Sequence, residues 1–369
     1  MPPVRRVTIA KEIELTIHQS FIKANGKRAR FHNLHLEADE TRVLNEIESR
    51  GYSVHVIREG GRVIIAAFGK EQTPQTLEAL TSWPQVEKVT PVQKRYKLVK
   101  RGTPQERTIV RINDHVSIGG NAVHLMAGPC SVENEKQLMT VAESVKASGA
   151  TILRGGAFKP RTSPYEFQGL GEKGLKLLDK ARKATGLAII TECLSEEHVE
   201  LVAEYTDIIQ IGTRNAQNFQ LLIAAARTGK PILLKRGSGM KIEEWLLAGE
   251  YILNSGNPNL LFCERGIRTF ETYTRNTLDL SAIPIMKKET HCPIVIDPSQ
   301  GCGSAKLVDS LCIGAIAMGA DALLIEVHPD PAHAWSDGPQ QITLEEFARL
   351  SSAIRPFLTA AGRTLGHIG

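Results

Sequence analysis

The feature that most constrains the fold is a series of eight short apolar segments between residues 119 and 369, each followed by glycine or polar residues. The segments do not alternate with polar residues, which indicates strands buried on both faces, as in parallel sheets. They cover residues 123–128, 150–155, 187–192, 207–212, 231–236, 259–264, 292–297 and 322–327. Amphipathic helical patterns lie between them, most clearly at 135–149 and 196–205. Eight such units in roughly 250 residues predict an α/β fold, a (β/α)8 or TIM barrel; a doubly wound open sheet is the alternative.

The residues before this barrel follow a different order. Strand-like and helix-like patterns alternate as β-α-β-β-α-β at residues 31–38, 40–51, 52–59, 62–69, 73–83 and 86–93. This order predicts a small ferredoxin-like α+β domain over residues 31–95. A charged stretch with Gly102 and Pro104 predicts a linker over residues 96–118. Residues 1–30 carry seven basic and two acidic side chains, which predicts a basic extension.

Composition excludes several classes of protein. The 45 Lys and Arg residues exceed the 40 Asp and Glu residues by only five, so we expect no nucleic acid partner. No apolar run approaches the roughly 20 residues of a membrane-spanning helix, so we expect no membrane partner. The six cysteines form no CxxC pair, which is typical of a reducing compartment. These observations predict a cytoplasmic enzyme.

Basic side chains follow the predicted strands at the end where barrel enzymes bind their substrates. They are Arg154, Lys159, Arg161, Arg214, Lys235 and Arg265. Like charges that converge on one cavity repel each other unless anions compensate them. Guanidinium groups match phosphate and carboxylate oxygens two at a time. The pattern therefore predicts a site for two small phosphorylated or carboxylated substrates.

A second group of residues has the chemistry of metal ligands. Cys130 follows the first predicted strand, Glu326 ends the eighth, and Asp337 lies shortly after it, with His328 and His333 nearby. Thiolate, carboxylate and imidazole together suit Zn, Fe or Mn. The alternative is that Cys130 is buried and inert.

Eight segments together resemble the 3-deoxy-D-arabino-heptulosonate 7-phosphate (DAHP) synthases, in the branch related to 3-deoxy-octulosonate 8-phosphate synthase. The segments are GPCSVE (128–133), LRGGAFKPRTSPYEFQGLGEKGL (153–175), IGTRNAQNF (211–219), LLKRG (233–237), CERGIRTFE (263–271), RNTLDLSA (275–282), IEVHPDP (325–331) and SDGPQQ (336–341). The N-terminal domain resembles the regulatory domain of some members of this branch.

The resemblance implies an activity and its site residues. Phosphoenolpyruvate, erythrose 4-phosphate and water would give DAHP and phosphate, the first step of the shikimate pathway to aromatic amino acids. Phosphoenolpyruvate would be held by Arg154, Lys159, Arg214, Lys235 and Arg265. Arg161 and Thr162, inside KPRTS (159–163), would hold erythrose 4-phosphate. The octulosonate relatives have a different sequence at that loop, so KPRTS favours the four-carbon sugar. The catalytic residues would be Lys159, Asp297 and Glu192.

The resemblance also implies a cofactor and partners. A divalent metal (Mn, Fe, Zn or Co) would bind Cys130, Glu326, Asp337 and the residue at position 300. The family has a metal-binding His there, in a DPSH motif, whereas this chain has Gln300. Three outcomes stay open: Gln300 or a water completes a weaker site, Cys302 replaces the His, or the metal is lost. We also expect a homo-oligomer, a tetramer by resemblance, and Tyr or Phe as an effector of the N-terminal domain.

The substitution at position 300 leaves two rival functions open. A non-catalytic or metal-impaired paralogue would still bind phosphoenolpyruvate, because the anion-holding positions are intact. A synthase for another phosphorylated aldose would keep the chemistry and change the second substrate.

Overall fold

The computed structural model describes residues 7–11, 29–59, 62–68, 77–84, 86–91, 95–103 and 106–368. It divides into two compact units, residues 1–95 and 96–369. Within the described ranges, no helix combines the length and apolar character needed to cross a membrane.

The second unit is the predicted barrel. Its eight parallel strands are β7 (Ala122–Gly128), β8 (Ile152–Arg154), β9 (Ala188–Cys193), β10 (Ile208–Ile211), β11 (Ile232–Lys235), β12 (Leu260–Glu264), β13 (Ile294–Ile296) and β14 (Ala322–Glu326). Each pairs with the next, and β14 pairs with β7, with Ala322 opposite His124 and Glu326 opposite Gly128. The sheet therefore closes, which confirms the barrel and excludes the open sheet. A short strand, β15 (Thr364–Leu365), adds to the start of β7.

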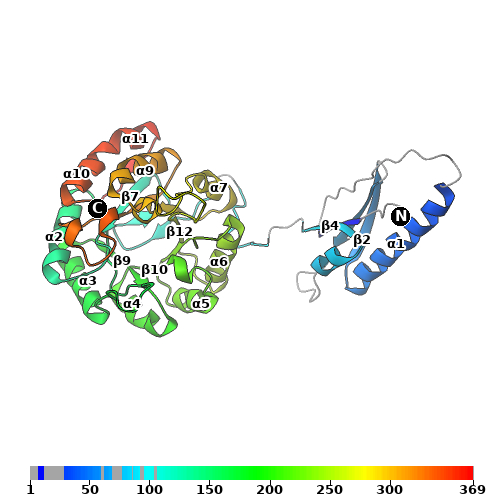
Figure 1. Ribbon diagram of the computed structural model, residues 1–369, viewed down its shortest axis with the longest axis horizontal. Coiled ribbons are helices and arrows are strands. Elements are labelled where there is room, and N and C mark those ends of the chain that lie inside the picture. The colour runs from blue at the N-terminus through cyan, green and yellow to red at the C-terminus, as the bar shows by residue number, and fades with distance from the viewer. Residues whose placement is uncertain are drawn as a thin grey trace. The chain divides into compact units, whose positions relative to one another are not determined.

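Helices surround this barrel, as Figure 1 shows. They are α2 (Glu135–Ala147), α3 (Glu172–Thr185), α4 (Val199–Tyr205), α5 (Phe219–Arg227), α6 (Ile242–Asn254), α7 (Ala282–Glu289), α8 (Pro298–Cys302), α9 (Ala305–Ala317), α10 (Leu344–Ala353) and α11 (Arg355–Ala360). Short 3-10 turns lie at η2 (Glu196–His198), η3 (Thr213–Asn215), η4 (Pro331–His333) and η5 (Gly338–Gln340). Local signals set the helix starts: the Asn134 side chain accepts from the backbone N–H of Gln137, and Thr343 and Glu346 form a capping box on α10.

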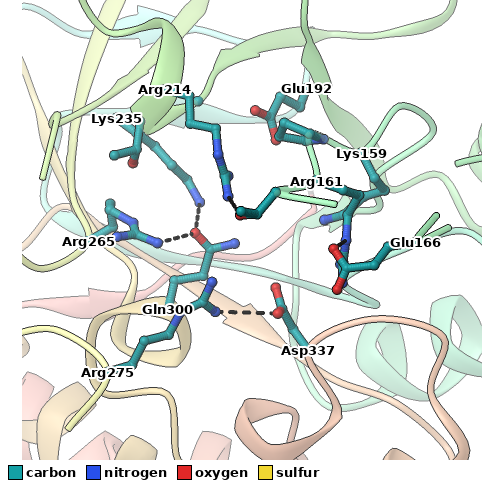
Figure 2. Close-up of a pocket in the computed structure, with 14 residues that line it drawn as sticks. Lys159, Arg161, Glu166, Glu192, Arg214, Lys235, Arg265, Arg275, Gln300 and Asp337 are labelled. Atoms are coloured by element: carbon teal, nitrogen blue, oxygen red, sulfur yellow. Dashed lines mark hydrogen bonds and ion pairs between the residues drawn. The ribbon is translucent and has the colours of Figure 1, made fainter. Parts of the chain in front are cut away.

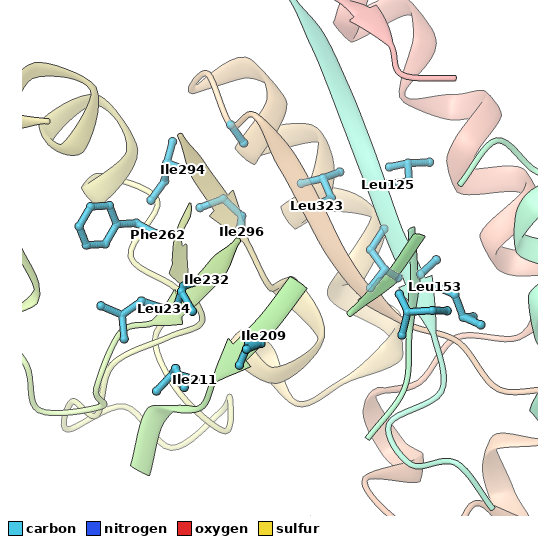
Figure 3. Close-up of a cluster of buried hydrophobic side chains, with 14 of the residues drawn as sticks. Leu125, Leu153, Ile209, Ile211, Ile232, Leu234, Phe262, Ile294, Ile296 and Leu323 are labelled. Carbon is cyan, nitrogen blue, oxygen red and sulfur yellow. The ribbon is translucent and has the colours of Figure 1, made fainter. Parts of the chain in front are cut away.

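The strands bury both of their faces. One face, including Leu125, Ile209, Leu234 and Ile296, packs against the helices in a continuous apolar cluster, part of which Figure 3 shows. The other face fills the barrel interior; there Met126, Ile152, Ile190, Leu233, Val295 and Leu324 are buried. Burial on both faces explains why these segments are apolar throughout. Most side chains within the strands are therefore apolar, with His124, Thr191 and Gln210 among the buried polar exceptions.

The predicted linker over 96–118 belongs to the barrel unit, which corrects the expected boundary. Strands β5 (Val110–Arg111) and β6 (Ser117–Ile118) form an antiparallel hairpin. Val110, Val116 and Ile118 are buried with the interior residues at the start of the barrel strands, such as Ala322. The hairpin thus closes the amino-terminal end of the barrel. The apolar residues of this hairpin alternate as in strands, but the charged residues that precede it led to the prediction of a linker.

The N-terminal unit has a four-stranded sheet in the order β2-β3-β1-β4. Its elements are β1 (Val7–Lys11), α1 (Ala29–Ser49), β2 (Ser53–Glu59), β3 (Arg62–Phe68), η1 (Leu77–Ser82) and β4 (Val86–Pro91). Strands β2 and β3 are antiparallel, and β1 runs parallel to β3 and β4. Val43, Ile47, Ile65, Leu80 and Val86 form its core.

Two expectations for this unit are corrected. Residues 31–38 continue the helix α1 and do not form the first strand. Phe31, Leu34 and Ala38 are also spaced for one helical face, and no Gly or Pro separates them from the helical pattern that follows. The first strand is β1, inside the predicted basic extension, and residues 29 and 30 of that extension begin α1. Its other residues, 1–6 and 12–28, lie outside the described residues. The predicted helix at 73–83 is a 3-10 helix, η1, within its described part.

Candidate active site

A cavity of about 230 Å³ opens where the barrel strands end. Six cationic and three acidic side chains line it, so its wall carries a net positive charge (Figure 2). The lining residues are Lys159, Pro160, Arg161, Thr162, Glu166, Glu192, Gly212, Thr213, Arg214, Lys235, Arg265, Arg275, Gln300 and Asp337. Five of the six cations predicted from the strand ends therefore meet in one place, and Arg275 adds to them. The sixth, Arg154, lies behind this wall.

Arg265 is a buried cation of the cavity that makes no ion pair with a carboxylate of the described residues. It follows β12 and is 7% exposed. Its Nη2 donates to Gln300 Oε1 at 3.1 Å, and its buried Nε has no hydrogen-bond partner in the structure. Burial lowers the pKa of this guanidinium, although Asp297 acts in the opposite direction. Since a buried cation without a counterion is unfavourable, this side chain is arranged to receive an anion.

Lys235 and Asp297 form a buried ion pair beside Arg265. Lys235 ends β11 and Asp297 follows β13, with β12 between these two strands, and Lys235 Nζ lies 2.6 Å from Asp297 Oδ2. Burial alone would raise the pKa of Asp297, but the Lys235 ammonium and the Arg154 guanidinium lower it overall. Asp297 also caps α8, because its Oδ1 accepts from the Gln300 backbone N–H at 2.9 Å. The pair therefore connects the cavity floor to the loop that carries position 300.

The predicted metal ligands Cys130, Glu326 and Asp337 come together, with ligand atoms within 4.8 Å of one another. Cys130 and Glu326 are fully buried. Burial, together with the Glu326 charge, raises the pKa of the Cys130 thiol to about 12. One thiol and two carboxylates are a donor set that fits a divalent transition metal or zinc. The alternative of an inert, isolated Cys130 does not match this clustering.

Asp337 reaches the cluster through an unusual backbone conformation. Its φ is 48°, in the left-handed region that L-residues with a Cβ rarely adopt. Asp tolerates this region better than most residues because its short side chain bonds locally. Here Arg275 Nη1 lies 3.4 Å from its Oδ1, and the Cys130 thiol donates to its Oδ2 at 3.4 Å. Backbone strain of this kind is found where a functional side chain must be aimed.

Other polar residues hold the three predicted ligands in position. Arg154 Nη1 lies 3.0 Å from Glu326 Oε1, and its Nη2 donates to the Cys130 carbonyl at 3.3 Å. Lys159 Nζ donates to the same carbonyl and to Cys130 Sγ, both at 3.1 Å. Burial opposes the charge of Lys159, but Cys130 and Glu326 raise its pKa overall, so its amine is protonated. Gln340 Nε2 donates to Glu326 Oε2 at 2.6 Å.

The other predicted candidates for metal ligands bond to groups other than Cys130 and Asp337. They are Gln300, Cys302, His328 and His333. Gln300 Nε2 donates to Glu326 Oε1 at 3.4 Å, while its Oε1 faces Lys235 and Arg265. The Cys302 thiol donates to the backbone carbonyls of Pro298, at 3.0 Å, and of Ser304, at 3.2 Å. His328 Nε2 lies 3.3 Å from Glu133 Oε1, and His333 Nδ1 lies 2.7 Å from Asp330 Oδ2.

The opposite wall of the cavity is more open. Arg161 Nη2 pairs with Glu166 Oε1 at 3.1 Å, and Arg214 Nη2 donates to Thr162 Oγ1 at 3.4 Å. Glu192 accepts from Gln210 Nε2 at 3.3 Å. A Cβ at Gly212 would lie 1.9 Å from Glu192 Oε1, so glycine is required there for this carboxylate to lie along the wall.

Sequence reasoning missed three polar residues of this site: Arg275, Gln340 and Glu166. Arg275 and Gln340 lie inside the segments 275–282 and 336–341 that carried the family resemblance, so their place in those segments could have pointed to them. They follow no strand directly and were therefore not found among the residues at strand ends.

Fold and site together define a (β/α)8-barrel enzyme that binds small anions beside a cluster of metal-binding side chains. The sequence model described as the DAHP synthetase I family matches residues 107–358, and the one described as the DAHP synthase ferredoxin-like domain matches residues 35–94. The chain belongs to the DAHP synthetase I family. This confirms the predicted family, the barrel with its ferredoxin-like domain, and the enzyme class, a DAHP synthase.

Individual relatives agree with this assignment. A phospho-2-dehydro-3-deoxyheptonate aldolase of Thermotoga maritima is 47% identical over 328 residues, which is 88% of this chain and 96% of the relative. A 2-dehydro-3-deoxyphosphooctonate aldolase of Caulobacter vibrioides is 34% identical over 256 residues, 64% of this chain and 88% of the relative. A divalent metal is the general cofactor of the family, which the cluster of Cys130, Glu326 and Asp337 fits.

Two solved structures are similar over most of their length. The crystal structure of phospho-2-dehydro-3-deoxyheptonate aldolase (DAHP synthase) from Thermotoga maritima superimposes with a TM-score of 0.85 at 46% identity, covering 89% of this chain and 96% of that one. A truncated form of 3-deoxy-D-arabino-heptulosonate 7-phosphate synthase from the same organism gives 0.69 at 48% identity, covering 73% and 99%.

Proposed function

We propose that this chain condenses phosphoenolpyruvate with erythrose 4-phosphate and water to give DAHP and inorganic phosphate, through the residues of this cavity. The observation that carries the proposal is the convergence of six cations in a cavity with only three acidic side chains. Two phosphorylated substrates, one of which also has a carboxylate, would supply the missing negative charge. Holding both in one cavity removes much of the entropic barrier to their reaction.

Phosphoenolpyruvate is assigned to the inner part of the cavity. Lys235 and Arg265 are buried side chains, and among the described residues their one neutral acceptor is Gln300 Oε1, at 3.4 and 3.1 Å. A phosphate or carboxylate would give Arg265 the anionic partner it lacks. Arg214 also lines the cavity and would hold the second anionic group of this substrate. Arg154 acts through Cys130 and Glu326, which it contacts, and positions them.

Erythrose 4-phosphate is assigned to the outer part, at Arg161 and Thr162. Arg161 is paired with Glu166, whose side chain is exposed, so an incoming phosphate can displace it. Thr162 is held toward the cavity by Arg214. The predicted preference for a four-carbon sugar rests on this loop.

The reaction needs a proton at the aldehyde oxygen and stabilisation of the departing phosphate. C3 of phosphoenolpyruvate attacks C1 of the aldehyde, so the new carbon–carbon bond leaves negative charge on that oxygen. The protonated amine of Lys159, close to Cys130, is positioned to donate the proton. Water then adds at C2, and Lys235 and Arg265 stabilise the phosphate as it leaves. Asp297, ionised by its pairing with Lys235, orients that amine, and Glu192 is a candidate to accept the proton of the water.

A divalent metal held by Cys130, Glu326 and Asp337 would, when bound, act as a Lewis acid toward the aldehyde carbonyl. Mn, Fe, Zn and Co all suit this donor set.

The decisive experiment follows the loss of phosphoenolpyruvate absorbance on addition of erythrose 4-phosphate, with EDTA, without EDTA, and with Mn²⁺ added back. We expect turnover that EDTA abolishes and Mn²⁺ restores. Turnover that EDTA does not affect would contradict the metal assignment. Binding of phosphoenolpyruvate with no turnover would identify a non-catalytic paralogue, and faster turnover with arabinose 5-phosphate would identify a different aldose substrate.

Regulation and assembly are part of the proposal. The ferredoxin-like domain is expected to bind Tyr or Phe and inhibit the barrel, in a cytoplasmic homotetramer. Deletion of residues 1–95 should abolish inhibition by these amino acids, and unchanged sensitivity would contradict the assignment. Light scattering on the full chain tests for the tetramer.

A further inference from the structure

Gln300 lies between two cations of the cavity, Lys235 and Arg265, which Figure 2 shows beside it, and the Glu326 carboxylate of the metal-binding cluster. Its Oε1 accepts from Arg265 Nη2 at 3.1 Å and from Lys235 Nζ at 3.4 Å. Its Nε2 donates to Glu326 Oε1 at 3.4 Å. The two ends of one amide therefore contact groups of opposite charge.

The charges around it determine which way this amide points. In the reversed orientation, the NH₂ group would face two cations and the carbonyl oxygen would face a carboxylate, so both ends would be repelled. A carboxamide has lone pairs for a metal only on its oxygen. That oxygen is turned toward Lys235 and Arg265, away from Glu326. The backbone of Gln300 is fixed as well, by its hydrogen bond to Asp297.

A second glutamine repeats the arrangement on the other oxygen of the same carboxylate. Gln340 Nε2 donates to Glu326 Oε2 at 2.6 Å, and Gln340 Oε1 accepts from Arg275 Nη1 at 2.8 Å. Arg275 also lines the cavity and pairs with Asp337. Each oxygen of Glu326 is thus held by an amide whose far end contacts a cation of the cavity.

We propose that Gln300 is a positioning residue and not a metal ligand in this chain. Cys130, Glu326 and Asp337 hold the metal, and solvent takes the place of the fourth protein ligand. Gln300 and Gln340 orient the Glu326 carboxylate and connect it to the cations that receive the substrates. This inference rests on the proposed function to the extent that a divalent metal binds these three residues.

The test counts the water molecules on bound Mn²⁺, from the broadening of its electron paramagnetic resonance lines in ¹⁷O-enriched water. The full chain is stripped with a chelator and reloaded with Mn²⁺ as the wild type and as the variants Gln300→Leu, Gln300→His and Gln340→Leu. We expect the same number of waters in the wild type and both Leu variants, and one fewer in Gln300→His, where an imidazole becomes a ligand.

Affinity is measured alongside but does not decide the question. Loss of a group that hydrogen-bonds a metal ligand costs about 10–100-fold in metal affinity. We expect losses in this range for both Leu variants, which makes Gln340→Leu the matched control. The water count separates the two roles, because only the loss of a true ligand adds a water.

Three results would overturn the proposal: one additional water in Gln300→Leu relative to the wild type, equal counts in the wild type and Gln300→His, or Mn²⁺ binding by Gln300→His but not by the wild type. The comparison of the wild type with Gln300→His decides the matter even if the Leu variant does not fold. Consumption of phosphoenolpyruvate is measured separately, so that a chain with the expected water count but no turnover would refute the proposed function and leave this inference standing.

Discussion

Replacing Arg265 with Met should stabilise the free protein while it removes phosphoenolpyruvate binding. Arg265 is 7% exposed. Within the part of the chain that the structure describes, its Nε has no hydrogen-bond partner and its Nη2 donates to the neutral Gln300 amide alone. No carboxylate lies within ion-pair distance of it among the described residues. The desolvation cost of this cation therefore exceeds the attraction of Asp297, since burial lowers the pKa of Arg265 overall, and an apolar side chain of similar length relieves that cost.

Arg236 is the matched control, because it is equally buried but fully paired. It is 5% exposed, and its Nη1 lies 2.9 Å from both Glu264 Oε2 and Asp279 Oδ2. Removing one member of a buried ion pair costs about 3–5 kcal/mol, whereas replacing buried charged groups completely by apolar side chains of similar volume is often neutral or stabilising, by up to about 1–4 kcal/mol. At about 2–4 °C per kcal/mol, the melting temperature should rise slightly in Arg265→Met and fall clearly in Arg236→Met.

Differential scanning calorimetry of the barrel transition, with and without phosphoenolpyruvate, provides the assay. Phosphoenolpyruvate at about 100 times its Kd should stabilise the wild type by about 2.7 kcal/mol. Arg265→Met loses two charge-assisted hydrogen bonds worth about 1.5–3 kcal/mol each, so its affinity falls at least about 100-fold and this stabilisation disappears. If Arg265→Met lowers the melting temperature as much as Arg236→Met does, then Arg265 is already compensated, and the argument for an anion site at this residue is refuted.

Three further outcomes are expected. Arg161→Ala should raise the KM for erythrose 4-phosphate at least about tenfold and leave that for phosphoenolpyruvate within about twofold; a larger effect on phosphoenolpyruvate would place the two substrates the other way round. Burial lowers the pKa of His124 from 6.5 to about 4, so its neutral form stabilises the fold above pH 6.5 and this contribution is lost as the pH falls toward 4. Between pH 7.5 and pH 5 the wild type should therefore lose about 2 kcal/mol more than His124→Gln in urea unfolding, and parallel losses would contradict this pKa. Gly212→Ala should reduce turnover, since a Cβ there would collide with Glu192 Oε1; kinetics indistinguishable from the wild type would show that this carboxylate is free to move.

The barrel and the membership of its site could largely be predicted, because both depend on local patterns. Uninterrupted apolar segments indicate strands buried on both faces, and the carboxyl ends of parallel barrel strands necessarily meet. For this reason Lys235 and Arg265, which end β11 and follow β12, could be brought together without coordinates. The N-terminal unit was harder: residues 31–38 fit two periods, and only the sheet itself shows that its first strand is β1.

The sequence alone determined which side chains at the ends of the strands reach the active-site end of this barrel, since the hydrophobic pattern marks each strand and the residue where it ends. Arg275, Glu166 and Gln340, which follow no strand directly, were not among them. What only the tertiary structure decided is how those side chains are oriented and paired. Arg265 remains without a carboxylate whereas Arg236 has two, and the amide of Gln300 turns its oxygen to the cations and its nitrogen to Glu326. These differences come from contacts between residues far apart in the chain, whose charges select one arrangement among several that the same residues allow.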